Sequence, residues 1–168
     1  GYVFVSSQGM GTTISPMDFS MQTTGMPRCV KGSVAASSDY SAIAQLGFEL
    51  SDAGGGVTPT KAGVWVDVKN NASSPLRFQV ESPDASMRWC AQLSGSGGFI
   101  PWTSLNTACW DNSGTAYKNE PIAKAMFLVP GTNMAAVPFD FCVNKLAEAD
   151  AAPTGTAAWR CRSSAWSV

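Results

Sequence analysis

Six tryptophan residues are the side chains of this sequence best suited to recognition chemistry. They occur in 168 residues that include no histidine and only 14% charged side chains. A flat indole ring can pack against the C–H face of a sugar ring, while planar amide, carboxylate and guanidinium groups can hydrogen-bond sugar hydroxyls. The alternative is that half or more of the rings belong to the core, since tryptophan is highly buried on average. The six residues are Trp65, Trp89, Trp102, Trp110, Trp159 and Trp166.

The lack of histidine excludes several kinds of site. Histidine-based catalytic triads and histidine-bound zinc or copper are excluded, and the five cysteines follow no zinc-binding spacing. No glycine-rich phosphate-binding motif is present. The net charge of -1 provides no electrostatic field for nucleic acid or an anionic membrane, and no apolar run reaches the length of a membrane span. We therefore expect neither nucleic acid nor a membrane as partner.

Alternation of apolar and polar residues predicts the elements that position these side chains. Apolar residues occupy every second position over residues 42–50, 64–68, 76–80, 87–93 and 139–143. This period of two is typical of antiparallel strands with one buried face. Residues 122–129 form an apolar run that fits a fully buried strand or a short helix, and the two prolines that bracket this short length favour the strand. Many short strands with glycine-rich turns predict an all-β fold, an antiparallel β-sandwich of the jelly-roll type.

The composition changes near residue 147. Residues 147–156 are rich in Ala, Glu, Asp, Pro and Thr, which is typical of a linker. We therefore predict a β-sandwich domain over residues 1–146. Residues 147–168 are predicted to be a linker and a C-terminal tail that is either tied back to the domain or disordered.

The cysteines predict disulfides and hence an oxidising, extracellular location. Cys90 and Cys109 flank a glycine-rich, tryptophan-bearing segment, and a disulfide between them would hold its rings at low entropic cost. Cys29 and Cys142 are the second expected pair, because the first and last strands of jelly rolls are often neighbours. The odd number leaves one cysteine unpaired or paired between chains.

Polar side chains alternate with the apolar ones on the predicted strands. If the apolar residues point inward, one solvent face carries Trp65, Asp67, Arg77, Gln79, Glu81, Arg88 and Gln92. An aromatic ring beside guanidinium, amide and carboxylate groups suits oligosaccharide recognition. Two alternatives remain: an ordinary polar sheet surface, or residues divided between two sheets, because consecutive jelly-roll strands alternate between sheets.

Four tryptophans have predicted positions. Trp65 lies opposite three valines in the strand period, so its ring should point away from the core, whereas Trp89 shares the face of Met87 and Leu93 and should be buried. Trp102 and Trp110 occupy the loop-like stretch around Cys109. Trp110 either faces solvent there or covers the disulfide as part of the core.

Three segments carry a resemblance to a known family. They are Arg88-Trp-Cys-Ala-Gln-Leu, Ile100-Pro-Trp-Thr-Ser-Leu-Asn-Thr-Ala-Cys-Trp-Asp and Val137-Pro-Phe-Asp-Phe-Cys-Val-Asn-Lys-Leu. Over residues 1–146 the chain resembles non-catalytic carbohydrate-binding modules of bacterial cellulases and hemicellulases. The resemblance implies a β-jelly roll, often with a structural calcium ion, that binds β-glucan in a cleft or on a flat face.

The expected function is non-catalytic binding of plant cell-wall β-glucan: cellulose, xyloglucan or mixed-linkage glucan. The module would be secreted, would need no cofactor, and would hold a linked catalytic domain near its substrate. Carbohydrate-binding residues are expected to be Trp65, Arg77, Gln79, Glu81, Arg88, Trp102 and Trp110. One alternative is an extracellular lectin or adhesin. Another is a small jelly-roll glycoside hydrolase, whose two carboxylates would come from Asp67, Glu81, Asp84, Asp111 and Glu120.

Overall fold

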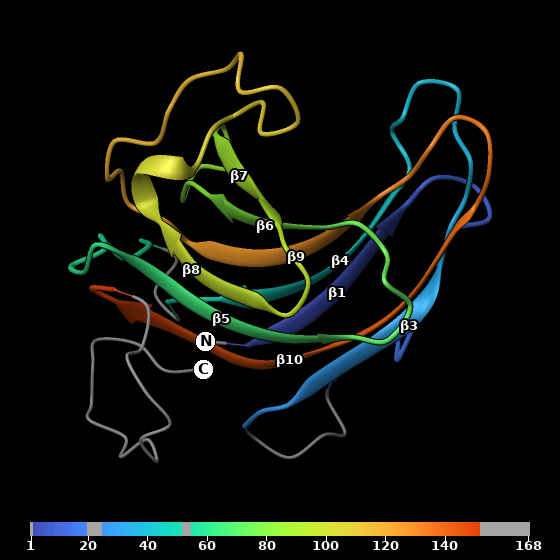
Figure 1. Ribbon diagram of the computed structural model, residues 1–168, viewed down its shortest axis with the longest axis horizontal. Coiled ribbons are helices and arrows are strands. Elements are labelled where there is room, and N and C mark those ends of the chain that lie inside the picture. Colours follow the sequence, from blue (N-terminus) through green and yellow to red (C-terminus); the bar gives the residue numbers. More distant parts are fainter. Residues whose placement is uncertain (1, 20–24, 52–54, 152–168) are drawn as a thin grey trace.

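Two antiparallel five-stranded sheets packed face to face form a β-sandwich (Figure 1). The computed structural model describes residues 2–19, 25–51 and 55–151. Sheet A has the strand order β1 (Val3–Gln8), β4 (Ile43–Glu49), β9 (Lys124–Pro130), β6 (Leu76–Glu81), β7 (Arg88–Leu93). Sheet B has the order β2 (Thr13–Ser15), β3 (Arg28–Val34), β10 (Val137–Ala149), β5 (Gly63–Asn70), β8 (Gly97–Pro101). A short 3₁₀ helix, η1 (Trp102–Ser104), follows β8. The predicted all-β sandwich is confirmed.

The core lies between the two sheets and is built by the residues that alternate inward. Phe48, Phe78 and Phe127 come from three neighbouring strands of sheet A and are fully buried. The ring of Phe127 meets the other two edge-on, at centroid distances of 6.1 and 5.7 Å. Valines of β5 and phenylalanines of β10 face them from sheet B. Burying each such side chain contributes about 1.5–3 kcal/mol, so this layer holds the sheets together.

The strand β10 continues past the predicted domain boundary at residue 146. A bulge between Val143 and Lys145 shifts its alternation, so that Leu146 and Glu148 become buried. The Glu148 carboxylate accepts hydrogen bonds from the Thr60 N–H at 2.8 Å and the Thr60 hydroxyl at 3.1 Å. The prediction of a linker from residue 147 is therefore wrong for residues 147–149. The predictions for the tail, including Trp159 and Trp166, lie outside the described residues.

Both predicted disulfides are confirmed. Cys29 and Cys142 face each other directly across β3 and β10, with a Cα–Cα distance of 3.9 Å. Cys90 on β7 is joined to Cys109, with a Cα–Cα distance of 5.4 Å. The fifth cysteine, Cys161, lies outside the described residues.

Candidate functional site

The outer face of sheet A brings together most of the predicted polar residues. The register between β6 and β7 places Arg77 beside Gln92 and Glu81 beside Arg88. Gln79 lies between these two rows, opposite Cys90. Because residues directly opposite each other in an antiparallel pair point to the same side, these side chains share one surface.

Trp110 is brought to this face by the segment 105–121, which runs along the free edge of β7 (Figure 1). Cys90 and Asn106 exchange two main-chain hydrogen bonds of 2.8 and 3.0 Å, and the Cys90–Cys109 disulfide adds a covalent link. Leu105 and Tyr117 anchor the ends of the segment in the core. Trp110 itself is 60% exposed, so the alternative that it covers the disulfide as part of the core is wrong.

The guanidinium of Arg77 packs against the Trp110 ring, 5.5 Å from its centroid. The Arg77 Nε is buried and has no hydrogen-bond partner in the part of the chain that the structure describes. Burial lowers the pKa of Arg77, but an arginine remains protonated at any ordinary pH. Packing therefore holds a positive charge beneath the ring, a geometry that stabilises the ring position by about 0.5–2 kcal/mol.

The Glu81 carboxylate is already hydrogen-bonded within the protein and is not free to accept from a ligand. Its carboxylate accepts hydrogen bonds from Arg88 Nε at 2.6 Å and Lys124 Nζ at 2.7 Å, and its side chain is 5% exposed. Burial alone would raise the pKa of Glu81, but the hydrogen bonds and charges of these two cations together lower it. The Arg88 side chain remains 59% exposed, so its other N–H groups are open to a ligand.

The rest of the face combines amides with apolar groups. The side chains of Gln79 and Gln92 make no hydrogen bond within the described ranges. At the β1 edge, the Phe4 ring lies over Gly47, where an added Cβ would come within 2.1 Å of the ring. Tyr2, 61% exposed, contacts Phe4 at a ring distance of 6.1 Å. Sheet A therefore carries aromatic groups near both edges, separated by about 19 Å if strands are spaced about 4.8 Å apart.

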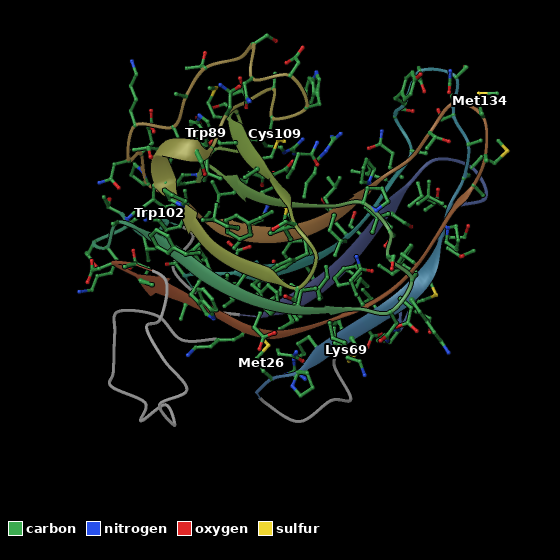
Figure 2. All side chains as sticks on the ribbon, in the orientation of Figure 1. Met26, Lys69, Trp89, Trp102, Cys109 and Met134 are labelled. Atoms are coloured by element: carbon green, nitrogen blue, oxygen red, sulfur yellow. A yellow bond between two sulfur atoms is a disulfide. The ribbon has the colours of Figure 1, made fainter. Side chains whose placement is uncertain are left out.

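Two predicted rings are not part of this surface. Trp102 is only 5% exposed and packs against Tyr117 at 5.9 Å, so its prediction as a stacking ring is wrong. Figure 2 shows Trp102 at η1, on the same side of the molecule as Trp89 and Cys109. Trp65 is half-buried on the outer face of sheet B, where it pairs with Phe99 and Ala147. Its strand joins the other sheet, so Trp65 lies on the opposite side of the sandwich from Arg77.

The candidate carboxylates of a hydrolase are dispersed. Asp67 is on sheet B, Asp111 is in the segment 105–121, and Glu120 accepts the Lys118 N–H at 2.7 Å. Hydrogen bonds from Ser82 and Ser86 lower the pKa of Asp84 to about 2. Of the five, Glu81 is on the outer face of sheet A.

Glu49 shares this row with Glu81, although the sequence did not single it out. Both lie opposite Lys124, one on each side of β9. Glu49 is 9% exposed, and its Oε2 has no hydrogen-bond partner among the described residues. Its position opposite Lys124 of β9 could not be read from the sequence because strand order is not encoded locally.

A pocket of about 300 Å³ adjoins the outer face of sheet A where β7 and β8 diverge. Gln92, Cys109 and Asn112 line it, so the pocket begins next to Trp110 and the disulfide. Asn112 is a residue that sequence reasoning missed. Asn112 has a left-handed backbone conformation, with φ of 59°. Its residue type does not reveal this position, because most asparagines adopt other conformations.

The structural calcium ion that the resemblance implies stays a prediction. Within them, no group of three or more Asp, Glu, His or Cys side chains converges on a common point. The carboxylates of Asp39, Asp84 and Asp111 each accept hydrogen bonds from neighbouring serines instead. Across the same residues, no helix has the length and apolar character needed to cross a membrane.

No protein-family model matches the chain, and no curated protein matches its sequence.

Proposed function

We propose that the chain is a non-catalytic carbohydrate-binding module that binds neutral β-glucan on the outer face of sheet A. The observation that carries this proposal is Trp110: a mostly exposed indole, fixed by a disulfide and an arginine. Next to it lie the amides of Gln79 and Gln92, which make no hydrogen bonds within the described residues. The module would serve a linked enzyme by keeping it near plant cell-wall polysaccharide.

The proposed chemistry needs no charge on the ligand. The Trp110 ring stacks on the C–H face of a pyranose, and a ring that is already fixed loses little entropy on binding. Gln79 and Gln92 both donate to and accept from sugar hydroxyls, while Arg88 donates. Tyr2 and Phe4 supply apolar contact near the β1 edge, so a chain lying across the strands meets aromatic groups at both ends.

The strand order supports the jelly-roll assignment. Four strands of sheet B, in the order β3-β10-β5-β8, oppose four of sheet A, in the order β4-β9-β6-β7. The chain thus passes repeatedly between the sheets, as expected for two Greek keys. The two disulfides are typical of proteins from oxidising compartments, which supports secretion.

Affinity electrophoresis tests the proposal, with hydroxyethyl cellulose, xyloglucan, mixed-linkage glucan and xylan in the gel. We expect a β-glucan to retard the parent and Trp110→Ala to weaken that interaction about tenfold or more, because the stacking ring is lost. Trp65→Ala is the matched control on the opposite sheet and should bind as the parent does. The reverse result would move the site to sheet B, and no retardation by any β-glucan would refute the function.

Glu49 and Glu81 favour a second candidate, a glycoside hydrolase. They lie on β4 and β6, which are separated by one strand, so their backbones are about 10 Å apart. This is near the separation of the two carboxylates in inverting enzymes, about 6.5–9.5 Å. Against it, Glu81 is bonded to two cations. Release of reducing sugar from β-glucan that disappears in Glu49→Gln would establish this candidate instead.

A further inference from the structure

The pocket between β7 and β8 lies at one edge of the sandwich, where the two sheets separate. Its opening adjoins Gln92, which is also part of the outer face of sheet A beside Arg77. A ligand stacked on Trp110 can therefore continue around the edge of β7 into the pocket.

The pocket exists because small residues occupy inward positions on both edge strands. Ala91 lies opposite the core residue Phe78, and Gly98 lies opposite the core residue Val66. A Cβ added to Gly98 would meet no heavy atom within 4 Å. Larger side chains at these two positions would fill the space between the sheets. With alanine and glycine there, the edge stays open.

The walls offer hydrogen-bonding groups from two strand edges. Main-chain bonds join Cys90 to Asn106, so the N–H and C=O of Gln92, two residues on, point from the same edge of β7. On the β8 side, the Ser96 carbonyl and the Trp102 N–H form main-chain hydrogen bonds toward β5. Alternate residues of an edge strand point their main-chain groups in opposite directions, so the N–H and C=O of Phe99 point away from β5. No main-chain hydrogen bond joins β7 to β8 in the described residues.

Two side-chain amides complete the lining. Gln92 and Asn112 both contribute to the pocket, and neither side chain makes a hydrogen bond within the described part of the chain. Together with the strand edges they present donors and acceptors in nearly equal number, which suits the hydroxyl groups of one sugar residue. The volume of about 300 Å³ is at the small end of the range for ligand pockets.

The pocket is partly open, and its lining includes residues at both ends. The core residue Ile100 is part of this lining. Ser94, in the turn between β7 and β8, lines one end, and Ser104 with Cys109 lines the other. A space of about 300 Å³ suits a single sugar residue, and the terminal residue of a chain enters such a space more easily than an internal one.

We propose that this pocket binds a terminal pyranose residue of the glycan, while Trp110 stacks on the residue next to it. This inference rests on the proposed function and narrows its ligand to sugars with a free end. The free end comes either from the end of the main chain or from a single-residue branch. The proposal therefore predicts binding at ends, in place of binding along the interior of the chain.

Isothermal titration tests this with three preparations: intact linear mixed-linkage glucan, the same glucan partly hydrolysed, and xyloglucan, which is branched. Binding sites are counted per mass of sugar. Each cut in a linear chain creates new ends, so we expect the hydrolysed glucan to bind more protein per mass than the intact one. If branches supply the terminal residue, intact xyloglucan will show high capacity without hydrolysis.

Variants identify the pocket as the cause. Asn112→Asp keeps the size and the left-handed backbone but removes two donors, and we expect about fivefold to tenfold weaker binding of ends. Asn119→Asp is the control: it has the same charge change and a positive φ of 69°, in the same segment, but does not line the pocket. Ala91→Leu fills the pocket and should reduce binding further, with melting curves to check the fold.

The results separate the two proposals. Equal capacity per mass before and after hydrolysis, with parent-like binding by both Asn112→Asp and Ala91→Leu, would overturn the terminal-residue pocket. Loss of binding in Trp110→Ala under those conditions would still support the proposed function. If none of the three preparations binds, both proposals fall.

Discussion

The exposure of Trp89, Trp102 and Trp110 separates core rings from a surface ring. Trp89 and Trp102 are buried, whereas Trp110 is exposed. Tyr117 packs between Trp89 and Trp102, with ring distances of 5.1 and 5.9 Å, and all three rings are buried. Burial raises the pKa of the Tyr117 hydroxyl, which stays protonated and donates to the Glu120 carbonyl. The Trp110 ring contacts the Arg77 guanidinium instead, and its neighbour Cys109 is bonded to Cys90.

Trp89→Ala should lower the free energy of unfolding by about 3–5 kcal/mol, because it removes a fully buried indole and leaves a cavity. Trp110→Ala is the matched control, since it deletes the same side chain from an exposed position. Its cost should be at most about 1 kcal/mol, the scale of an exposed cation–π contact. Urea unfolding followed by circular dichroism measures both, and equal losses would contradict the assignment.

Glu81→Gln should destabilise the fold by about 1–3 kcal/mol at neutral pH, because a buried charge that accepts two hydrogen bonds is lost. The control is Asp150→Asn, which breaks an ion pair with Lys61 whose side chains are 42% and 68% exposed. That exposed pair should contribute much less, because solvent screens its charges. A similar loss in the two variants would show that the burial of Glu81 has no energetic effect.

The same residue predicts a pH dependence. The pKa of Glu81 is lower in the folded protein than its ordinary value of 4.5, so its contribution is complete above that value. The contribution disappears as the pH falls through the lowered pKa. The stability difference between parent and Glu81→Gln should therefore shrink from neutral pH to about pH 3. A stability difference that increased as the pH fell would contradict a lowered pKa of Glu81 in the folded protein.

Among the elements, the segment 105–121 combines two structural roles. It covers part of the free edge of β7, which reduces the unpaired main chain available for aggregation, and it carries Trp110. The disulfide joins residues 19 apart in sequence, and closing a loop of this size stabilises by about 3 kcal/mol in the chain-entropy model. The ring that we propose as the stacking platform thus belongs to a segment that is hydrogen-bonded and disulfide-linked to β7.

The two disulfides should differ in their rate of reduction. Cys29 is exposed on the outer face of sheet B, whereas Cys90 and Cys109 are 5% and 6% exposed. An attacking thiolate needs access to sulfur, so a limited amount of dithiothreitol should open Cys29–Cys142 first. Alkylation and peptide mapping at successive times measure the order. Earlier labelling of Cys90 or Cys109 would mean that the segment 105–121 opens readily.

The sequence predicted elements wherever alternation was strong. The strands β4, β5, β6, β7 and β10 follow runs with an inward apolar residue at every second position, whereas β9 follows a continuous apolar run between two prolines. The strand β3 was not predicted, because Arg28 and Gly32 interrupt its inward positions. The extension of β10 was missed because the bulge at residue 144 reverses the alternation that identifies its inward face.

The site could be predicted only in part, because local alternation does not show which strands share a sheet. A period of two tells which way a side chain points from its own strand, but does not tell which sheet the strand joins. Trp65 and Arg77 were therefore assigned to one face although β5 and β6 belong to different sheets. Trp102 was expected in a loop, yet η1 turns its ring onto Tyr117.

At the scale of the whole molecule, the two outer faces differ in character. The outer face of sheet A carries Trp110 with the amides, and its buried acid Glu81 is neutralised by Arg88 and Lys124. The outer face of sheet B carries Trp65 and an exposed disulfide. With a net charge of -1, the molecule offers no long-range field that would select an anionic ligand. The proposed recognition of a neutral glycan therefore relies on short-range contacts.

This predicts that glycan binding is nearly independent of salt. A neutral β-glucan releases no condensed counterions, so its dissociation constant should change less than about twofold between about 50 and 200 mM sodium chloride. Carboxymethylated glucan, which keeps the backbone but adds charge, is the control, because any binding of it that depends on Arg88 should weaken as salt rises. Titrations of both polymers at the two salt concentrations measure the contrast. A steep loss of affinity for the neutral glucan would mean that exposed cations, and Arg88 first among them, dominate binding in place of the Trp110 ring.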